Sequence, residues 1–535
     1  MQNKILAWRR GAALTTVSAL ALGLASSALA QELRVAFPAS SEPANLDYHV
    51  DPYTPTMLMN SFMTDPLVVR APDGSFVPGL AASWEISDDA TEVTMALKEG
   101  VTFQDGTPFN AEAVLANFER ILAPETGSAL LAQEVGPLAS MEAVDDLTVK
   151  FVYDEAWVTF LDMASKAPMW SPTAFNASTP QDFDKELIGT GPFKLVEWVQ
   201  NDYILMETWD GYGGWNSVSE TGGPAQVDGV RLQFIAEDAV LGSVVASGES
   251  DIAYQLPALA VEQYLESDDA ELLSIGQAGV GLQMIFNVRN PPLSDKRLRQ
   301  AILYSRNMDL ANQILYNGLY GEADGPLNNI HPCFWEGASE MYQQDLDKAV
   351  ALLEEAGWVE GPGALRVAQG VEGVEDGTRL ELGWSVLHHA EIGEVVQAQL
   401  LEIGIGISVE QVPGPIQLER VNARDFDIMF ERLRSADPKI LDDMWNPAYD
   451  QPGGWAWTGY DNPELTALLE VVAQNPDWDT RCQAAKDAQK IIMEEALMVP
   501  TLSQPSYFAV SNKVEGFKLG AQGTHFFLHD VRFVE

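Results

Sequence analysis

Two arginines and one aspartate lie close together after a short apolar stretch, residues 426–430. Arg432, Arg434 and Asp437 fall within six residues. A guanidinium offers a planar fork of donors that suits a carboxylate, and a carboxylate accepts hydrogen bonds from an ammonium group. A zwitterionic or acidic organic ligand would satisfy all three side chains. The alternative is an internal ion pair between an arginine and Asp437 that steadies the loop.

Aromatic side chains gather just beyond these charges. Trp445, Trp455, Trp457 and Tyr460 lie within sixteen residues. We expect Trp445 and Trp455 to line a pocket, where an indole can cover a sugar or a peptide side chain; packing at a hinge is the alternative. Tyr254 ends a predicted strand, and open α/β sheets bind ligands outside the carboxyl ends of their strands, so it is a further pocket candidate.

The sequence lacks the motifs of common catalytic and nucleotide-binding sites. His388 and His389 are followed by Glu391 at the wrong spacing for a helical His-Glu-x-x-His zinc site. No Gly-x-Ser-x-Gly motif occurs, and the two glycines at 189 and 191 lack the third glycine and the helix of a phosphate-binding loop. We therefore predict a binding protein rather than an enzyme, with no cofactor and no metal site.

The elements that must position these residues are clearest in residues 80–122. Residues 92–98 alternate apolar and polar, which indicates a half-buried strand. Asp105 and Gly106 supply turn chemistry, because glycine takes positive φ without steric cost. Asn110 then stands at a helix N-cap position, with Phe109 and Val114 spaced for a hydrophobic staple.

The same stretch resembles a known family. Trp84, the Phe-Gln-Asp-Gly-Thr-Pro-Phe sequence of residues 103–109 and the Ala-Glu-Ala of 111–113 are similar to the signature of the extracytoplasmic solute-binding proteins, family 5. These are the periplasmic peptide- and nickel-binding receptors of ABC importers. Residues 188–194 and 283–295 resemble further motifs of that family. The resemblance implies an α/β, two-lobed periplasmic-binding-protein-like fold (type II, cluster C) with an extra subdomain in the first lobe.

This organisation divides the chain as follows. Residues 1–30 read as a signal peptide, with Lys4, Arg9 and Arg10 before an apolar core and small residues up to Ala30, so cleavage is expected near Ala30. Residues 31–280 would form the first lobe, with an α/β appendage at about 70–190. Residues 281–498 would form the second lobe, with one helix over residues 296–312 and a largely parallel sheet, and residues 499–535 would return to the first lobe.

The family resemblance also bears on the ligand. In the family the strand end before Arg432 faces the cleft, and peptide receptors place an acidic group near there to hold an amino terminus. Nickel-type receptors have an arginine at the position of Arg432, and a segment similar to Tyr53-Thr54-Pro55 lines their cleft, so Tyr53 is a further ligand candidate. Their adjacent tryptophan, their downstream histidine and an arginine near residues 165–170 are missing here. We therefore expect no tight nickel binding.

Charge and cysteine content limit partners and compartment. The net charge of −47 becomes −50 once the three basic residues of the signal peptide are removed. Such a surface repels nucleic acid and anionic lipid headgroups. Cys333 and Cys482 are the two cysteines of the chain, and after export they could pair or remain thiols.

The prediction from the sequence is a periplasmic, monomeric receptor that captures a small peptide or another zwitterionic or acidic organic ligand and delivers it to the permease subunits of an ABC importer. Closure of the two lobes would then depend on a ligand that binds the closed form better than the open one. A receptor for a sugar or a nickel complex, and a ligand-dependent chemosensory receptor, are the alternatives.

Overall fold

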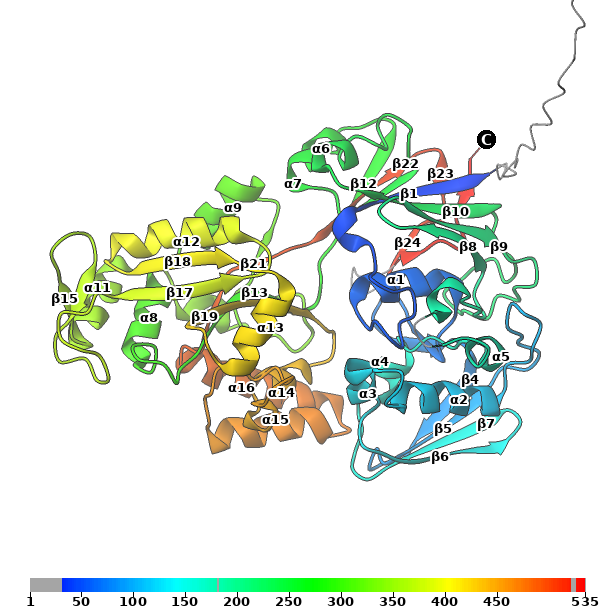
Figure 1. The fold of residues 1–535 in the computed structure, drawn as a ribbon, viewed down its shortest axis with the longest axis horizontal. Coiled ribbons are helices and arrows are strands. Elements are labelled where there is room, and N and C mark those ends of the chain that lie inside the picture. The colour runs from blue at the N-terminus through cyan, green and yellow to red at the C-terminus, as the bar shows by residue number, and fades with distance from the viewer. Residues whose placement is uncertain (1–30, 180–181, 521–525, 535) are drawn as a thin grey trace, which may run out of the picture.

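The computed structural model describes residues 31–179, 182–520 and 526–534. The expected signal peptide and its cleavage position lie outside these residues. The described chain forms two lobes, each built around its own central sheet, as the resemblance predicted (Figure 1). None of the helices within the described residues has the length and apolarity of a membrane span.

The first lobe is built on a seven-stranded mixed sheet. Its parallel centre is β1 (Glu32–Pro38), which pairs with β10 (Gly229–Ile235) on one side and β11 (Ile252–Tyr254) on the other. The remaining pairings in this sheet are antiparallel. In spatial order the strands are β12 (Ala270–Ile275), β22 (Ser506–Ser511), β11 (Ile252–Tyr254), β1 (Glu32–Pro38), β10 (Gly229–Ile235), β9 (Tyr203–Thr208) and β8 (Phe193–Val199).

A four-stranded antiparallel sheet forms a separate layer on this lobe, at the lower right of Figure 1. Its strands in spatial order are β4 (Ala81–Ile86), β5 (Glu92–Leu97), β7 (Thr148–Tyr153) and β6 (Leu138–Asp145). The predicted strand and helix are confirmed: α2 (Ala111–Leu122) follows β5, and the Asn110 side chain accepts a hydrogen bond from the backbone N–H of Ala113. Phe109 and Val114 are both buried in the core of this layer.

The turn before α2 ties this layer to the first lobe. The Gln104 amide donates to the backbone carbonyls of Met63, Gly191 and Phe193 at 3.2, 3.0 and 2.8 Å. Gly191 packs directly against Met63, because a Cβ at position 191 would lie 2.5 Å from a backbone atom of Met63. The glutamine and the glycine of the two family-like motifs therefore hold one junction together.

The second lobe contains a five-stranded sheet that is mixed rather than largely parallel. β17 is parallel to β18 and β19, but β13 is antiparallel to β19 and to β20, because β13 and β20 run along the segments that join the lobes. The spatial order is β18 (Gly406–Gln411), β17 (Glu381–Val386), β19 (Ile428–Arg434), β13 (Gly279–Phe286) and β20 (Met498–Pro500).

The prediction of a single helix over residues 296–312 is wrong. The chain forms α8 (Lys296–Ser305) and α9 (Met308–Tyr316) instead. Arg306 takes an extended conformation, and the Asn307 side chain caps α9 by accepting from the N–H of Leu310. The apolar spacing runs through this break, which is why periodicity alone did not find it.

Two further helices are short. They are α4 (Phe160–Ala164) and α6 (Asp238–Leu241), and turns follow α6. The other described α-helices are α1 (Thr54–Met63), α3 (Ala129–Val135), α5 (Pro172–Phe175), α7 (Ala258–Val261), α10 (Ala338–Met341), α11 (Leu346–Glu355), α12 (Ala390–Glu402), α13 (Gly414–Ala423), α14 (Ile440–Trp445), α15 (Pro463–Gln474) and α16 (Trp478–Glu494).

Short two-stranded ribbons complete the described strands. They are β2 (Val68–Arg70) with β3 (Phe76–Pro78), β14 (Gly321–Glu322) with β21 (Leu502–Ser503), β15 (Trp358–Glu360) with β16 (Arg366–Ala368), β23 (Val514–Glu515) with β26 (Arg532–Phe533), and β24 (Lys518–Leu519) with β25 (Phe526–Phe527).

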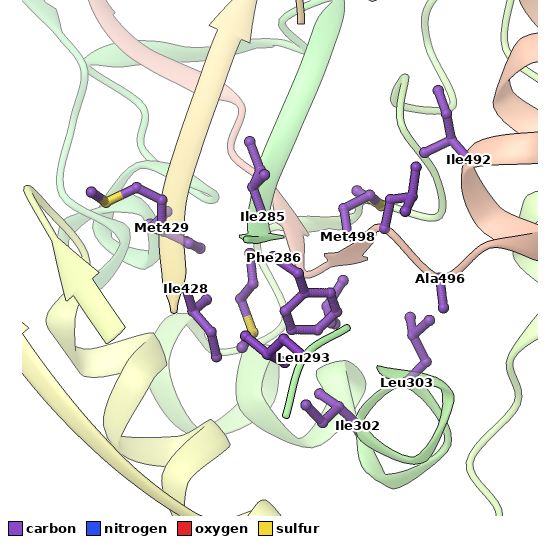
Figure 2. Packing of buried hydrophobic residues seen from close by; sticks show 14 of the residues in the cluster. Ile285, Phe286, Leu293, Ile302, Leu303, Ile428, Met429, Ile492, Ala496 and Met498 are labelled. Carbon is purple, nitrogen blue, oxygen red and sulfur yellow. The ribbon is translucent and has the colours of Figure 1, made fainter. Parts of the chain in front are cut away.

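The core of the second lobe lies where β13, β19 and β20 meet helices α8 and α16. Figure 2 shows Phe286, Leu293, Ile302 and Met498 converging there, and all four are almost fully buried. Cys333 and Cys482 form a disulfide at the edge of this core, with their Cα atoms 4.8 Å apart. The two cysteines are therefore paired rather than free thiols.

The lobes are joined, within the described residues, where β12 leads to β13 and where β21 leads to β22. The two connections touch, because the Gln277 amide donates to the Ser506 hydroxyl at 2.6 Å. Few crossing segments of this kind are what a hinge between rigid lobes requires.

Candidate ligand-binding cleft

A cavity of about 400 Å³ lies between the two lobes. The first lobe contributes residues before and in α1 together with α3 and α4, and the second contributes the end of β19 and the start of α14. The lining residues are Tyr48, Pro52, Tyr53, Thr54, Met57, Gln133, Glu134, Trp157, Thr159, Asp162, Met163, Lys166, Arg432, Leu433, Arg434, Ser435, Asp437, Lys439, Ile440, Asp443 and Trp455.

Arg432 and Arg434 lie on a strand, whereas the sequence had suggested a loop. β19 continues to Arg434 because its last residues pair with Val280 and Gly279 of β13. Side chains alternate along a strand, so residues 432 and 434 project from the same face. A fixed strand positions two guanidinium groups more firmly than a loop would.

The two arginines have no carboxylate partner among the described residues. The Arg432 guanidinium donates to the Gln504 side chain, in the segment that joins the lobes. The Nε of Arg434 is buried without an acceptor in the described structure. Burial, followed by repulsion from Arg432, lowers the pKa of Arg434 to about 10, and burial also lowers the pKa of Arg432. An anionic group would relieve both costs.

Asp437 lines the cavity, but its carboxylate already accepts hydrogen bonds from other residues of the protein. Its two carboxylate oxygens accept from the guanidinium of Arg481 in α16, and one of them also accepts from the backbone N–H of Lys439. Both side chains of this ion pair are almost fully buried. The internal Arg–Asp pair considered from the sequence is therefore present, but the arginine is Arg481, 44 positions downstream.

The first-lobe wall carries a charge network that sequence reasoning missed. The Asp162 carboxylate pairs with Lys166 and with Arg70, each at 2.6 Å. Burial raises the pKa of Asp162, but Lys166 and Arg70 outweigh it and hold the value at about 2. Glu134 of α3 lies 3.4 Å from the Lys166 ammonium, and its pKa is raised, first by burial. This wall therefore contains fixed charges of both signs.

The second-lobe wall reaches the first lobe through Lys439. Its ammonium group pairs with Asp443 at 2.5 Å and lies 5.7 Å from the centre of the Trp157 ring in the first lobe. Burial lowers the pKa of Lys439, but Asp443, Tyr449 and Asp442 together outweigh it, so the pKa is raised. The lobes thus contact each other beside the cavity through a cation–π arrangement.

The four aromatic candidates divide into two groups. Tyr53 is 60% exposed and lines the cavity, as does Trp455, which stacks on Trp457 with ring centres 5.4 Å apart. Trp445 does not line it, because its ring lies in the core of the second lobe. Tyr254 is also outside the lining, since its ring is buried against Phe37, Phe508 and Phe526 of the first lobe.

The sequence contains only a weak signal for the lining residues that were not predicted. A cation does stand within residues 165–170, but it is Lys166 rather than the arginine sought there. Glu134 and Trp157 lie in segments without a motif, more than 270 positions before Arg432, and only the folded chain brings them to the cleft.

The cleft is equipped for binding. It offers one half-exposed glutamate, aromatic faces and two arginines that have no carboxylate partner among the described residues. No group of three or more His, Cys, Asp or Glu side chains within the described structure is arranged to hold a metal ion. The arrangement therefore fits recognition of charged organic groups.

The comparisons with known proteins match this chain to one family. The family model "Bacterial extracellular solute-binding proteins, family 5 Middle" matches residues 75–455. The glutathione-binding protein GsiB of Pectobacterium atrosepticum is 26% identical over 470 residues, which cover 83% of this chain and 84% of that protein.

Solved structures share the fold over nearly the whole chain. NikA from Brucella suis in complex with Fe(III)-EDTA superposes with a TM-score of 0.80 at 22% identity, covering 94% of this chain and 100% of NikA. The oligopeptide-binding protein AppA from Bacillus subtilis, in complex with a nonapeptide, gives 0.78 at 18% identity, covering 95% and 100%. The resemblance seen in the sequence is confirmed: this chain belongs to the bacterial extracellular solute-binding proteins, family 5.

Proposed function

We propose that the protein is the periplasmic receptor of an ABC importer and that it captures a small peptide or another acidic, zwitterionic organic molecule between its lobes. The observation that carries this proposal is the pair of arginines, Arg432 and Arg434, that line the inter-lobe cavity without a carboxylate partner in the described chain. We assign the carboxylate end of the ligand to them.

The overall charge makes this pair unusual. The chain has 78 acidic and 31 basic residues, so an arginine has many potential partners. Eleven of the fourteen other described arginines form ion pairs with carboxylates. Arg299, Arg306 and Arg379 do not, but none of these three lines the cavity. Half-buried arginines left without one are costly unless another anion binds them. A cavity of about 400 Å³ is in the lower part of the range for small-molecule sites, which suits a ligand the size of a short peptide.

The two arginines have different roles in this proposal. Arg434 lacks a partner among the described residues and takes the ligand carboxylate directly. Arg432 contacts Gln504, which lies between β21 and β22 in one of the two connections between the lobes. A ligand held by both would therefore act on the hinge, and preferential binding to the closed form would drive closure.

Export and delivery complete the proposal. Residues 1–30 would direct secretion and be removed near Ala30. The closed, monomeric receptor would dock on permease subunits at the inner membrane, with no chemical change to its cargo. Glutathione, a small peptide with two carboxylates and one ammonium group, is a reasonable first test ligand, because a relative 26% identical to this chain is named for binding it.

The experiment is ligand identification on the mature protein. Native mass spectrometry of freshly purified protein would detect a retained molecule, and calorimetry after unfolding and refolding would measure the affinity of that molecule and of glutathione. We expect an anionic or zwitterionic compound that binds Arg434→Ala at least tenfold more weakly, because a desolvated charge pair is worth about 2–5 kcal/mol. A neutral sugar as the retained ligand, bound equally by the variant, would refute the proposal.

A further inference from the structure

We propose that Glu134 of the first lobe receives the ammonium group of the ligand, with Asp443 of the second lobe facing the same group. This inference rests on the proposed function, because it names the group that would bind the amine of a ligand whose carboxylate is assigned to Arg432 and Arg434. The predicted cargo is an acidic molecule with a free amine.

Among the carboxylates that line the cavity, Glu134 has the longest contact with a cation in the described structure. Asp162 and Asp443 each hold a lysine in a short ion pair, at 2.6 and 2.5 Å, and Asp437 is held by two hydrogen bonds from Arg481. Glu134 has a single contact with a cation, at 3.4 Å from Lys166. A carboxylate can accept about four hydrogen bonds, so most of the capacity of Glu134 is unused.

The exposure of these carboxylates points the same way. The side chain of Glu134 is 41% exposed, whereas those of Asp162 and Asp437 are 12% and 11% exposed. Glu134 lines the cavity, so this exposed surface is available to a ligand. Asp162, by contrast, is enclosed by Arg70 and Lys166 and serves to hold Lys166 in place.

Asp443 gives this end of the site a contribution from the second lobe. It lines the same cavity, and its charge is close enough to Glu134 to raise the pKa of Glu134, by less than burial and Asp162 do. Two carboxylates on opposite lobes repel each other as the lobes close. A cation between them replaces repulsion with attraction, so an ammonium group would favour the closed form.

The charged groups of the two lobes therefore select one class of ligand. The second lobe supplies two arginines for one or two carboxylates, and the first lobe supplies Glu134 for the amine. A short peptide with a free amino group and an acidic side chain matches this pattern. An N-acylated peptide keeps the anionic end but loses the group that Glu134 would bind.

The test uses the refolded mature protein and a defined panel of probes. The panel contains glutathione and dipeptides and tripeptides with one Asp or Glu, each paired with its N-acetylated form. Thermal shift identifies binders and calorimetry measures their affinities for wild type and Glu134→Gln. Glu155→Gln is the control, because Glu155 is an exposed glutamate that does not line the cavity.

We expect Glu134→Gln to weaken binding of a free-amine probe by about ten- to a hundredfold, within the range for loss of one partner of a charged contact. The affinity of Glu134→Gln for the N-acetylated probe should stay within about threefold of the wild-type affinity. The wild type should bind the free-amine probe more tightly than the N-acetylated probe. Glu155→Gln should bind both probes as the wild type does.

The alternative results separate the two proposals. Equal binding of the free-amine probe by Glu134→Gln and wild type would overturn this inference and leave the proposed function standing. The inference is also overturned if N-acetylation has no effect, or if the variant loses both forms equally. A wild-type protein that binds no member of the panel would contradict the short-peptide cargo inferred here, whereas the proposed function is tested separately by the retained molecule.

Discussion

Replacing Arg434 by methionine should weaken ligand binding and, at the same time, stabilise the ligand-free protein. Arg434 lies on β19 without a carboxylate partner in the described structure, and burial lowers its pKa from 12.5 to about 10. Each pKa unit corresponds to about 1.4 kcal/mol of differential free energy. Because Arg434 keeps some exposure, we expect about 1–3 kcal/mol of added stability when the charge is removed.

The assay is urea unfolding of the mature protein after its retained ligand has been removed by unfolding and refolding. Calorimetry with the ligand identified by mass spectrometry gives the second measurement, where the loss should be about 2–5 kcal/mol. Ligand removal matters, because bound ligand stabilises the wild type and would hide the effect.

Two control variants make the result specific to an unpaired charge. Arg481→Met removes the cation of a buried pair with Asp437 and should cost about 3–5 kcal/mol of stability. Arg379→Met removes an exposed arginine and should change stability by less than about 0.5 kcal/mol. If Arg434→Met destabilised the ligand-free protein as Arg481→Met does, Arg434 would have a structural role and the reasoning would be wrong.

Three further predictions concern other parts of the molecule. Burial raises the pKa of Asp65 to about 7, so the folded state holds a proton that the unfolded state releases near pH 4, and stability should fall as pH rises from about 4 to 7. Asp65→Asn should remove that fall, and identical pH profiles in urea unfolding would contradict it. Cys333→Ser with Cys482→Ser should lower stability by about 2–5 kcal/mol, because the disulfide closes a loop of about 150 residues, and an unchanged melting temperature would count against this. Nickel with free histidine should not bind tightly, and sub-micromolar affinity in calorimetry would contradict the expectation.

Local sequence was sufficient where one segment sets its own conformation. The strand at residues 92–97 and the cap at Asn110 were predictable, because alternation and capping depend on residues a few positions apart. The break at Asn307 was not predicted, since an apolar pattern continued through a residue that caps the next helix. The continuation of β19 to Arg434 was also missed, because pairing with β13 supplies hydrogen bonds that charged residues alone do not suggest.

The cleft could be predicted only in part, for a similar reason. The arginines were found because they cluster in sequence and the family resemblance placed them at a strand end. The role of Arg481 as the partner of Asp437 was not visible, since the two residues meet through the packing of α16. Glu134 and Lys166 come from the other lobe, and no local pattern relates them to residues 432–443.

The distribution of charge in the cleft explains why it should close on a ligand and not without one. Each lobe presents charge that its own neighbours leave incompletely compensated: two arginines on β19 of the second lobe, and Glu134 on α3 of the first. Closure without cargo brings like charges together and removes water from them, which is costly. A molecule with an anionic end and an ammonium group satisfies both walls at once. The same groups that reduce the stability of the empty, closed form therefore make its closure selective for the cargo.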